Sequence, residues 1–451
     1  MPRPVFPFAS RASRALLVAS FVALTACAQF KVQFKLTAPP AETQPAPVAA
    51  APVETLAPAP EPVAPEPVVP EMVRIGLMVP LTGSAARVGQ DLLDAAQMAL
   101  FDFRPGQFEL RVYDSGSNPV IAGAAAARAQ QDGVQFLLGP LFSGAVGAVA
   151  DVLRPAGIPV YAFSSDRLVG GDGVYVGGFV PEAQVARTVG FAARRGMFRF
   201  ASLVPNDAYG SRMNTSFGDA VLDAGGEIVA GSFYPYDTEG MTEAVRTLAR
   251  YDERAEELKL EKERLAEKND AISQRAIERL ETLDTLGEVG FEALLLLDGG
   301  EQILQLSPLL AFFDIDPVQV KLLGTWIWDD PALGKEPSML GAWYAAPPRV
   351  SRLRFVERFA QTYGRDPDRL ATLAYDGVAL AAVLALSKGP AGMPYAMENL
   401  ENPEGFAGVD GIFRLHPSGE VERGLAVLEI GRDGPREIDP APTNFRELPT
   451  N

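Results

Sequence analysis

Short apolar runs alternate with helical patterns along most of this chain. The alternation is clearest over residues 134–163, where Val134–Leu138 and Ile158–Phe163 are apolar runs of the kind that forms buried parallel strands. Between them, Ala145–Leu153 carries apolar residues at helical spacing, and Ser143 stands at the position of a helix N-cap. Gly157 ends the helical pattern. This order predicts a βαβ unit.

The same alternation extends on both sides of this unit and restarts after Pro181-Glu182. The first series is expected to contain strands at Val73–Val79, Phe108–Tyr113 and Tyr175–Phe179, and helices at Gln90–Phe101 and Pro119–Gln131. The second series is expected to contain strands at Ala201–Val204, Glu227–Phe233, Ala293–Leu297 and Lys321–Thr325, and helices at Ala186–Arg195, Ser211–Ala224 and Gln302–Phe312. Alternating strands and helices are typical of doubly wound, mostly parallel sheets. The sequence therefore predicts an α/β protein with two lobes.

We expect the chain to pass more than once between the lobes. Lobe 1 is assigned to residues 73–181 and completed by 345–395, and lobe 2 is assigned to residues 182–344 and completed by 396–436. Helices are expected at Leu353–Tyr363 and Arg369–Leu386, and a late hairpin at Val409–Leu415 and Leu425–Ile430, whereas residues 437–451 are expected to form a loose tail.

A charged segment, residues 239–286, interrupts the second series and is expected to be a helical insertion in lobe 2. It has no Gly or Pro from Met241 to Leu286. One straight helix of this length would extend about 70 Å. Polar residues at Lys262 and Asn269 interrupt the apolar seam, which favours a helical hairpin with its turn near Asn269-Asp270 over one long coiled-coil helix. Both a docking arm and a solvated insertion fit the charge pattern.

The N-terminal residues have the pattern of an export signal. Residues 1–26 combine three arginines with a short apolar stretch, and the only Cys of the chain, Cys27, follows small residues. This arrangement resembles the lipobox of bacterial lipoproteins, which implies lipidation of Cys27, although an ordinary signal peptide with a chance Cys is the alternative. Ala28 in place of Asp implies retention at the outer membrane. The Pro- and Ala-rich residues 27–72 are expected to form an extended tether.

Composition excludes several classes of function. The formal net charge of −17 argues against a nucleic-acid partner, which requires a basic face. One Cys and one His exclude a disulfide framework and Cys/His metal sites. No nucleophile elbow, phosphate-binding loop or dinucleotide-binding motif follows any expected strand. We therefore expect no enzymatic activity, no catalytic residues, no metal and no cofactor.

Polar residues that follow the expected strands are candidates for binding a small molecule. Ligands of open α/β sheets bind outside the carboxyl ends of the strands. Hydroxyl groups and loop N–H groups suit a carboxylate, and an Asp carboxylate suits an ammonium group. Each serine is also compatible with a simple capping or turn role. The candidates are Ser84, Ser143 and Ser165 on the first lobe, and Tyr209 and Asp298 on the second.

Several short segments, in order, resemble type I periplasmic binding proteins of the leucine/isoleucine/valine-binding kind. They are Gly76–Gly89, Leu138–Ser143, Val204–Gly210, Lys321–Trp326, Ala374–Ala379 and Gly408–Arg414. The resemblance implies a two-lobed fold with a ligand cleft, in which residues matching Ser143, the Phe163–Ser165 loop and Tyr209 bind an amino acid.

Within that superfamily the chain looks most like the penicillin-binding-protein activator lipoproteins. The lipobox, the Pro/Ala tether, the helical insertion and the closing segments 411–415 and 423–430 carry this likeness. It implies a non-catalytic lipoprotein, anchored by lipid and facing the periplasm, that binds and activates a peptidoglycan synthase. The alternative is a solute-binding lipoprotein of an ABC importer for amino acids or related small amphiphiles.

Overall fold

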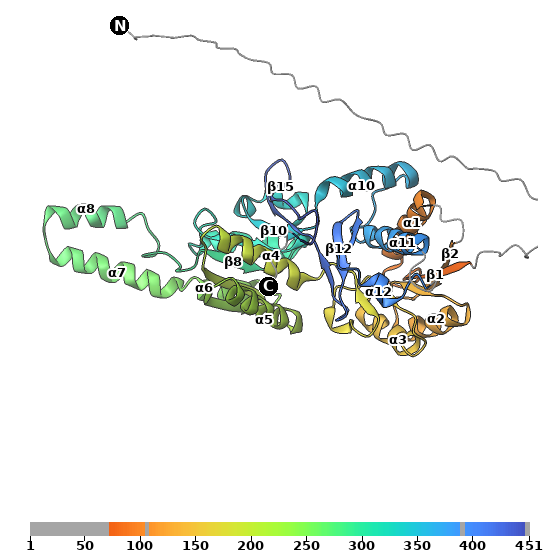
Figure 1. Ribbon diagram of the computed structural model, residues 1–451. Helices are drawn as coiled ribbons and strands as arrows, with labels where there is room; N and C mark the ends of the chain where they lie inside the picture. The colour runs from red at the N-terminus through yellow and green to blue at the C-terminus, as the bar shows by residue number, and fades with distance from the viewer. Residues whose placement is uncertain (1–71, 104–107, 388–392, 447–451) are drawn as a thin grey trace, which may run out of the picture. The chain divides into compact units, whose positions relative to one another are not determined.

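A computed structural model describes residues 72–103, 108–387 and 393–446 of the protein. The expected signal peptide, Cys27 and most of the tether lie outside these residues. Two mostly parallel sheets, each covered by helices on both faces, dominate the described part of the chain (Figure 1). The two-lobed α/β fold expected from the sequence is confirmed.

The first lobe is built on a five-stranded sheet. Its strand order is β2-β1-β3-β4-β5, and every neighbouring pair is parallel. The strands are β1 (Val73–Val79), β2 (Phe108–Asp114), β3 (Phe136–Leu138), β4 (Val160–Ala162) and β5 (Val174–Val176). Strands β3, β4 and β5 are buried throughout, as expected for apolar runs covered on both faces.

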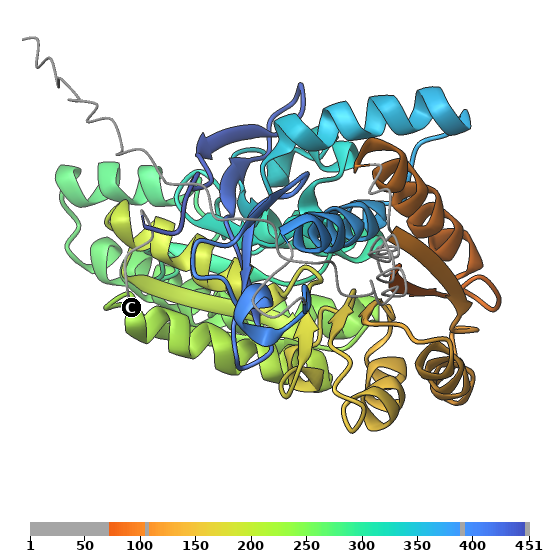
Figure 2. The same cartoon turned by 45° about the vertical axis from the view of Figure 1, so that its right-hand side comes forward.

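Two pairs of helices cover this first sheet. On one face, α1 (Ala86–Phe103) packs against α11 (Ala371–Ser387), so segments far apart in the sequence lie side by side (Figure 2). On the other face, the Ala-rich α2 (Pro119–Gln131) packs against α3 (Ser143–Leu153). The buried faces of α2 and α3 consist of Ala, Val and Leu, which form a compact apolar core with the sheet.

The second lobe is built on a seven-stranded sheet of order β15-β14-β10-β9-β8-β6-β7. The strands are β6 (Arg199–Pro205), β7 (Glu227–Tyr234), β8 (Ala293–Leu296), β9 (Lys321–Gly324), β10 (Trp343–Ala346), β14 (Ala426–Glu429) and β15 (Arg436–Asp439). The first five are parallel, and β14 and β15 are added antiparallel at one edge. Helices α4 (Pro181–Arg194) and α5 (Ala208–Asp223) cover one face, and α6 (Thr238–Leu248) and α9 (Gly300–Phe312) cover the other.

The C-terminal part of the chain differs from our expectation in three places. The late hairpin forms between β12 (Gly411–Leu415) and β13 (Val421–Arg423), which together with β11 (Phe406–Gly408) make a third, antiparallel sheet. Leu425–Ile430 was expected to form the second strand of that hairpin. It instead contains β14, which pairs with β10 of the second sheet. The expected tail begins with β15, because Arg436–Asp439 pairs with β14.

The segment 396–436 is divided between the two lobes, although we expected it to complete the second. Leu400, Phe413 and Leu415 pack into the core of the first lobe with α1 and α11. Only from Ala426 onward does the chain pair with the second sheet. Apolar side chains of the third sheet are buried by the first lobe, which explains the different division.

Three segments cross between the lobes: Gly177–Val180, Ala346–Arg349 and Arg423–Ala426. The first is tightly packed, because a Cβ on Gly177 would lie 2.3 Å from the Tyr161 ring. Arg423 donates to the Gly177 carbonyl at 2.6 Å and so connects the first and third crossings. Helix α10 (Arg349–Tyr363) follows the second crossing.

The insertion is a helical hairpin, as the polar seam predicted. Helix α7 (Tyr251–Glu267) is followed by a turn and by α8 (Ala271–Leu280), which begins at the N-cap Asp270. Asn269 in the turn has a positive φ of 49°, a backbone conformation that Asn tolerates. Figure 1 shows both helices, here called the arm, projecting away from the second sheet.

The arm begins later than expected from the sequence. Residues 239–248 belong to α6, whose Met241, Val245 and Leu248 are buried in the second core. In contrast, α7 buries only Arg254 and Leu258. Its strongly charged sequence has too few apolar residues to pack against a sheet, and this explains why it leaves the lobe.

Candidate ligand-binding site

The candidate residues follow strands on either side of the point where the strand order of each sheet reverses. In the first sheet, the reversal lies between β1 and β3, which lead to Ser84 and Ser143. In the second sheet, it lies between β6 and β8, which lead to Tyr209 and Asp298. At such a point the loops separate to opposite faces and leave room for a ligand. Topology therefore places four of the five candidates where open α/β sheets bind their ligands.

Tyr209 lies close enough to Asp298 for that carboxylate to influence the pKa of the phenol. Tyr209 is the second residue of α5 and half-buried. Burial raises its pKa to about 12, and the nearby carboxylates of Glu182 and Asp298 act in the same direction. The phenol is therefore a neutral hydrogen-bonding group at any physiological pH.

Two further tyrosines surround Asp298. The Tyr234 hydroxyl donates to the Asp298 carboxylate, and Tyr236 also interacts with it. Burial is the main cause that raises the pKa of Asp298, and the neighbouring Asp207 contributes. Asp207 also caps α5 by accepting the Gly210 N–H at 2.7 Å. A half-buried carboxylate beside aromatic rings is suited to a cationic group.

Two tryptophans that follow β9 have different roles. Trp328 is completely buried, and its indole N–H donates to the Asp298 main-chain carbonyl at 2.8 Å. It therefore fixes the loop after β8. Trp326 is only partly buried, and its ring lies 5.4 Å from that of Phe179 in the first crossing segment. Arg369 of the first lobe stacks on both of these rings.

The three serines of the first lobe follow adjacent strands. Ser84 and Ser165 are exposed, and Ser143 is half-buried. Ser143 is the first residue of α3 and not its N-cap: Phe142 holds the N-cap position and makes no capping hydrogen bond. The hydroxyl of Ser143 therefore does not cap this helix.

A network of four charged side chains connects the loop after β4 with α4 and α5. Arg212 on α5 lies 3.8 Å from Asp166 and 3.4 Å from Glu182. Arg167 lies 3.9 Å from the same Glu182 oxygen. Asp166 also accepts the Leu168 N–H at 3.2 Å. The charge of Asp166 beside Ser165 is therefore balanced by Arg212.

Two polar atoms in this network form no hydrogen bond within the described part of the chain. They are Oε2 of Glu182 and Nε of Arg212. Glu182 is only 7% exposed, so water does not readily solvate its carboxylate. The ring of Tyr209 lies 5.8 Å from the Arg212 guanidinium. A buried acceptor and a buried donor next to a candidate residue indicate a place where a ligand group can bind.

Sequence reasoning did not select Arg212 or Glu182. Glu182 follows Pro181 at the start of α4, a position where a carboxylate normally favours the helix N-terminus. Arg212 is one turn beyond Tyr209, and only the structure shows that its side chain reaches the other lobe. The only sign of these two residues in the sequence was that they carry opposite charges and lie close to loops that follow strands.

Within the described residues, no group of His, Cys, Asp and Glu has the arrangement of a metal site. The single His, His416, is in the hairpin turn and lies 2.9 Å from Glu422. None of the helices between residues 72 and 446 that the structure describes is long and apolar enough to span a bilayer.

Comparison with known families gives a match over almost the whole described chain. Residues 72–435 match the family model described as periplasmic binding protein. Two curated proteins are also similar. An uncharacterised protein of Rickettsia prowazekii is 22% identical over 39% of this chain, and a Leu/Ile/Val-binding protein of Rhizobium johnstonii is 32% identical over 19% of it. The matches span 47% and 25% of the lengths of these two relatives.

Solved structures share the fold. A putative branched-chain amino acid ABC transporter protein from Rhodospirillum rubrum has a TM-score of 0.63 at 19% identity, covering 81% of this chain and 100% of that one. A branched-chain amino acid ABC transporter ligand-binding protein from Burkholderia xenovorans has a TM-score of 0.61 at 17% identity, covering 82% of this chain and 94% of that one. A Streptococcus pneumoniae substrate-binding protein in complex with isoleucine has a TM-score of 0.52 at 18% identity, covering 82% of this chain and all of that one.

Proposed function

Because this chain belongs to the periplasmic binding protein family, a family of non-catalytic proteins, we propose that it is a solute-binding protein of an ABC importer. The observation that carries the proposal is the position of Ser84, Ser143, Tyr209 and Asp298 beside the reversal points of the two sheets. Relatives of the same fold include proteins named for branched-chain amino acids and one solved with benzoate.

The proposed ligand carries a cationic or strongly donating group at the second lobe. Asp298 and the hydroxyl groups around it suit an ammonium group, and the rings of Tyr209 and Tyr236 suit the apolar body next to it. On the first lobe, Ser143 and Ser165 offer hydroxyl donors to an acceptor such as a carboxylate. Amino acids and related small amphiphiles have this combination.

A binding experiment tests the proposal. Purified protein is titrated calorimetrically with single amino acids, with benzoate and with aliphatic amines. A ligand at about 100 times its Kd stabilises the folded state by about 2.7 kcal/mol, so the same ligands are ranked first by the shift in melting temperature. The variant D298N is expected to lose affinity for any cationic ligand, whereas D223N, at an exposed position of α5, keeps it. Binding that is equal in D298N and the unchanged protein contradicts the proposed site.

A second candidate function is activation of a peptidoglycan synthase. The observation that favours it is the arm, which projects from the second lobe and buries few of its own residues (Figure 1). Docking raises synthase activity only if it stabilises the active conformation of the enzyme more than the inactive one. The test adds purified protein to a bifunctional synthase and measures the rate of glycan polymerisation. The rate increases if the protein is an activator and stays unchanged if it serves only an importer.

The proposed location is the periplasmic side of the cell envelope, with a lipid anchor at Cys27 in the outer membrane. A C27A variant tests the anchor, because it is expected to move the protein from the membrane fraction to the soluble periplasmic fraction. Retention of the variant in membranes contradicts lipidation at this residue.

A further inference from the structure

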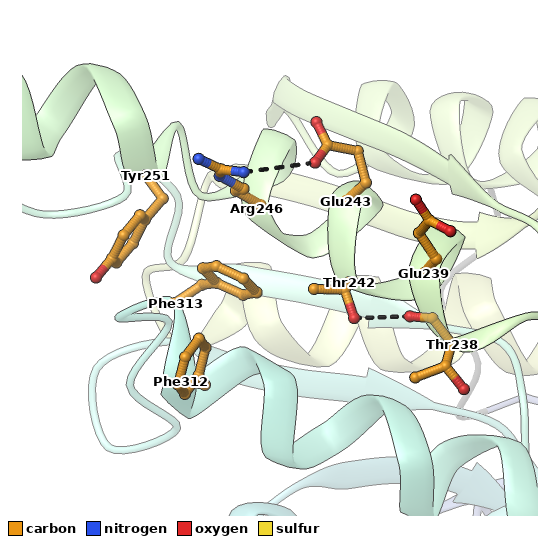
Figure 3. Close-up of a pocket in the computed structure, with 8 residues that line it drawn as sticks. All are labelled: Thr238, Glu239, Thr242, Glu243, Arg246, Tyr251, Phe312 and Phe313. Carbon is orange, nitrogen blue, oxygen red and sulfur yellow. Dashed lines mark hydrogen bonds and ion pairs between the residues drawn. The ribbon is translucent and has the colours of Figure 1, made fainter.

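A hollow with a volume of about 790 Å³ lies at the root of the arm, between α6 and the C-terminal end of α9 (Figure 3). We call it the acidic groove. Its lining residues are Thr238, Glu239, Thr242, Glu243, Arg246, Tyr251, Phe312 and Phe313. Figure 3 shows the three aromatic rings grouped at one end and the acidic side chains along α6.

The aromatic end of the groove exposes a large apolar side chain. Phe312 is 72% exposed, although it packs at 90° against the buried Phe313 with ring centroids 5.0 Å apart. Tyr251 packs on the other side of Phe313 at 5.2 Å. The exposed Leu304 and Pro308 precede Phe312 on α9 at intervals of four residues. These three residues form an apolar stripe along one side of the helix.

The other wall of the groove is negatively charged. Glu239 and Glu243 are exposed and stand four residues apart on α6. Arg246 is the only cation among the lining residues; its guanidinium donates to Asp252 at 2.6 and 3.0 Å and lies 3.9 Å from the Glu243 carboxylate (Figure 3). Its charge is therefore already balanced. The adjoining residues 251–286 contain eleven acidic and seven basic side chains, so the surroundings are also acidic.

The groove is separate from the candidate ligand-binding site. Helix α9 begins at Gly300, two residues after Asp298, and ends at Phe312. A helix rises about 1.5 Å per residue, so these ends are roughly 18 Å apart. Phe312 consequently lies toward the other ends of the strands, away from Tyr209 and Asp298. A molecule in the groove does not compete with a small solute.

We propose that the acidic groove binds a positively charged amphipathic segment of a second protein. The apolar side chains of that segment pack on Phe312 and the α9 stripe, and its Lys or Arg side chains pair with Glu239 and Glu243. Charge complementarity selects this occupant, because Glu239 and Glu243 outnumber the single cation Arg246, which Asp252 also neutralises. The exposed Phe is the anchor that a partner covers, and the acidic wall sets the orientation of the bound segment.

Fluorescence anisotropy with a labelled leucine–lysine helical peptide and the purified full chain tests this proposal. We expect the variants F312S and E239K/E243K to bind the peptide about tenfold more weakly than the unchanged protein. A leucine–glutamate peptide of the same length and pattern is expected not to bind. Binding should weaken with added salt, because exposed ion pairs are screened.

Helix α5 provides a matched control. It carries an exposed Leu222 beside Asp219 and Asp223, which are also four residues apart. The variants L222S and D219K/D223K likewise replace an exposed apolar side chain by Ser and two carboxylates by Lys, and we expect them to keep full affinity. Equal losses in the two sets of variants would mean unspecific attraction to an acidic protein and would overturn the proposal. A dimer that F312S converts to a monomer in sedimentation would assign the surface to a second copy of the chain and also overturn it.

Discussion

The guanidinium of Arg212 lies 3.8 Å from the carboxylate of Asp166, and this ion pair joins α5 of the second lobe to the loop after β4 of the first. The same guanidinium lies 3.4 Å from Glu182, which is almost completely buried. Exposed ion pairs contribute little to stability, but removing the partner of a buried charge is costly. Arg212 therefore has its largest effect through Glu182.

We expect R212M to destabilise the protein by about 1–3 kcal/mol, because it leaves the buried Glu182 carboxylate with one distant cation, Arg167. Urea unfolding of R212M, E182Q and the double variant measures this effect. The double variant should recover most of the loss, since no buried charge remains. Additive losses in the double variant would show that the two side chains act independently.

The pKa of Asp298 leads to a prediction for binding at low pH. Burial raises this pKa above its ordinary value, so Asp298 takes up a proton at a higher pH than an exposed Asp does. A protonated carboxyl group no longer attracts a cation. We expect the affinity for a cationic ligand to fall as the pH decreases through the acidic range, and D298N to show weak affinity at every pH. Calorimetric titrations at several pH values test this, and a pH-independent affinity in the unchanged protein would contradict it.

Asp376 is expected to make stability depend on pH. It accepts the Val409 N–H at 2.7 Å in a buried cluster with Asp410, Arg369 and Arg423. Burial and the nearby Asp410 raise its pKa to about 7, although Arg423 opposes the shift. Between roughly pH 4 and 7 the folded protein keeps a proton that the unfolded chain releases, so this group lowers stability as the pH rises through that window.

The variant D376N removes this titration and keeps an oxygen that accepts the Val409 N–H. The difference in unfolding free energy between D376N and the unchanged protein should shift in favour of D376N by up to about 4 kcal/mol from the acidic to the alkaline side of the window. Denaturant unfolding at several pH values gives this difference. A constant difference would show that Asp376 is ionised throughout.

Deleting the arm should leave the rest of the protein folded. Its two ends are adjacent, because the Leu286 N–H donates to the Arg254 carbonyl at 3.0 Å. A short Gly/Ser linker in place of residues 255–285 therefore spans the gap, and a melting curve should show one cooperative transition. Deletion of residues 239–286 should prevent folding, since it removes Met241, Val245 and Leu248 from the second core, each worth about 2–5 kcal/mol.

Gly210 is expected to tolerate no side chain. A Cβ at this position would lie 1.9 Å from the Pro205 carbonyl oxygen, where the chain turns from β6 into α5. Gly89 has the same relation to the Pro80 carbonyl at the start of α1, also at 1.9 Å. We expect G210A to destabilise by about 1–3 kcal/mol through this backbone clash. The control G147A, where no atom lies within 4 Å, should stabilise by about 0.5–1 kcal/mol.

The order of elements was predictable because it depends on local apolar patterns. The buried runs Val134–Leu138 and Ala293–Leu297 have no alternation, as expected for strands that helices cover on both faces. The later strands were harder to assign. β14 and β13 are separated by only two residues yet belong to different sheets, and no local pattern distinguishes their partners.

For the candidate site, the sequence predicted which residues follow the strands but not which side chains contact one another. Strand ends indicated Tyr209 and Asp298, because topology alone brings neighbouring strand ends together. The contacts of Arg212 were not predictable, since a long side chain in the middle of a helix can point in several directions. The boundary of the arm was missed because no Gly or Pro separates α6 from α7, and only the buried face of α6 distinguishes them.

The adjacent entry and exit of the arm have a consequence for the history of the chain. A hairpin that leaves and rejoins a lobe at neighbouring backbone atoms can be gained or lost in one genetic event, without repair of the sheet beneath it. The two lobes and the arm are thus free to diverge at different rates. Relatives that keep the sheets but carry no arm, or a longer one, would be natural products of that freedom.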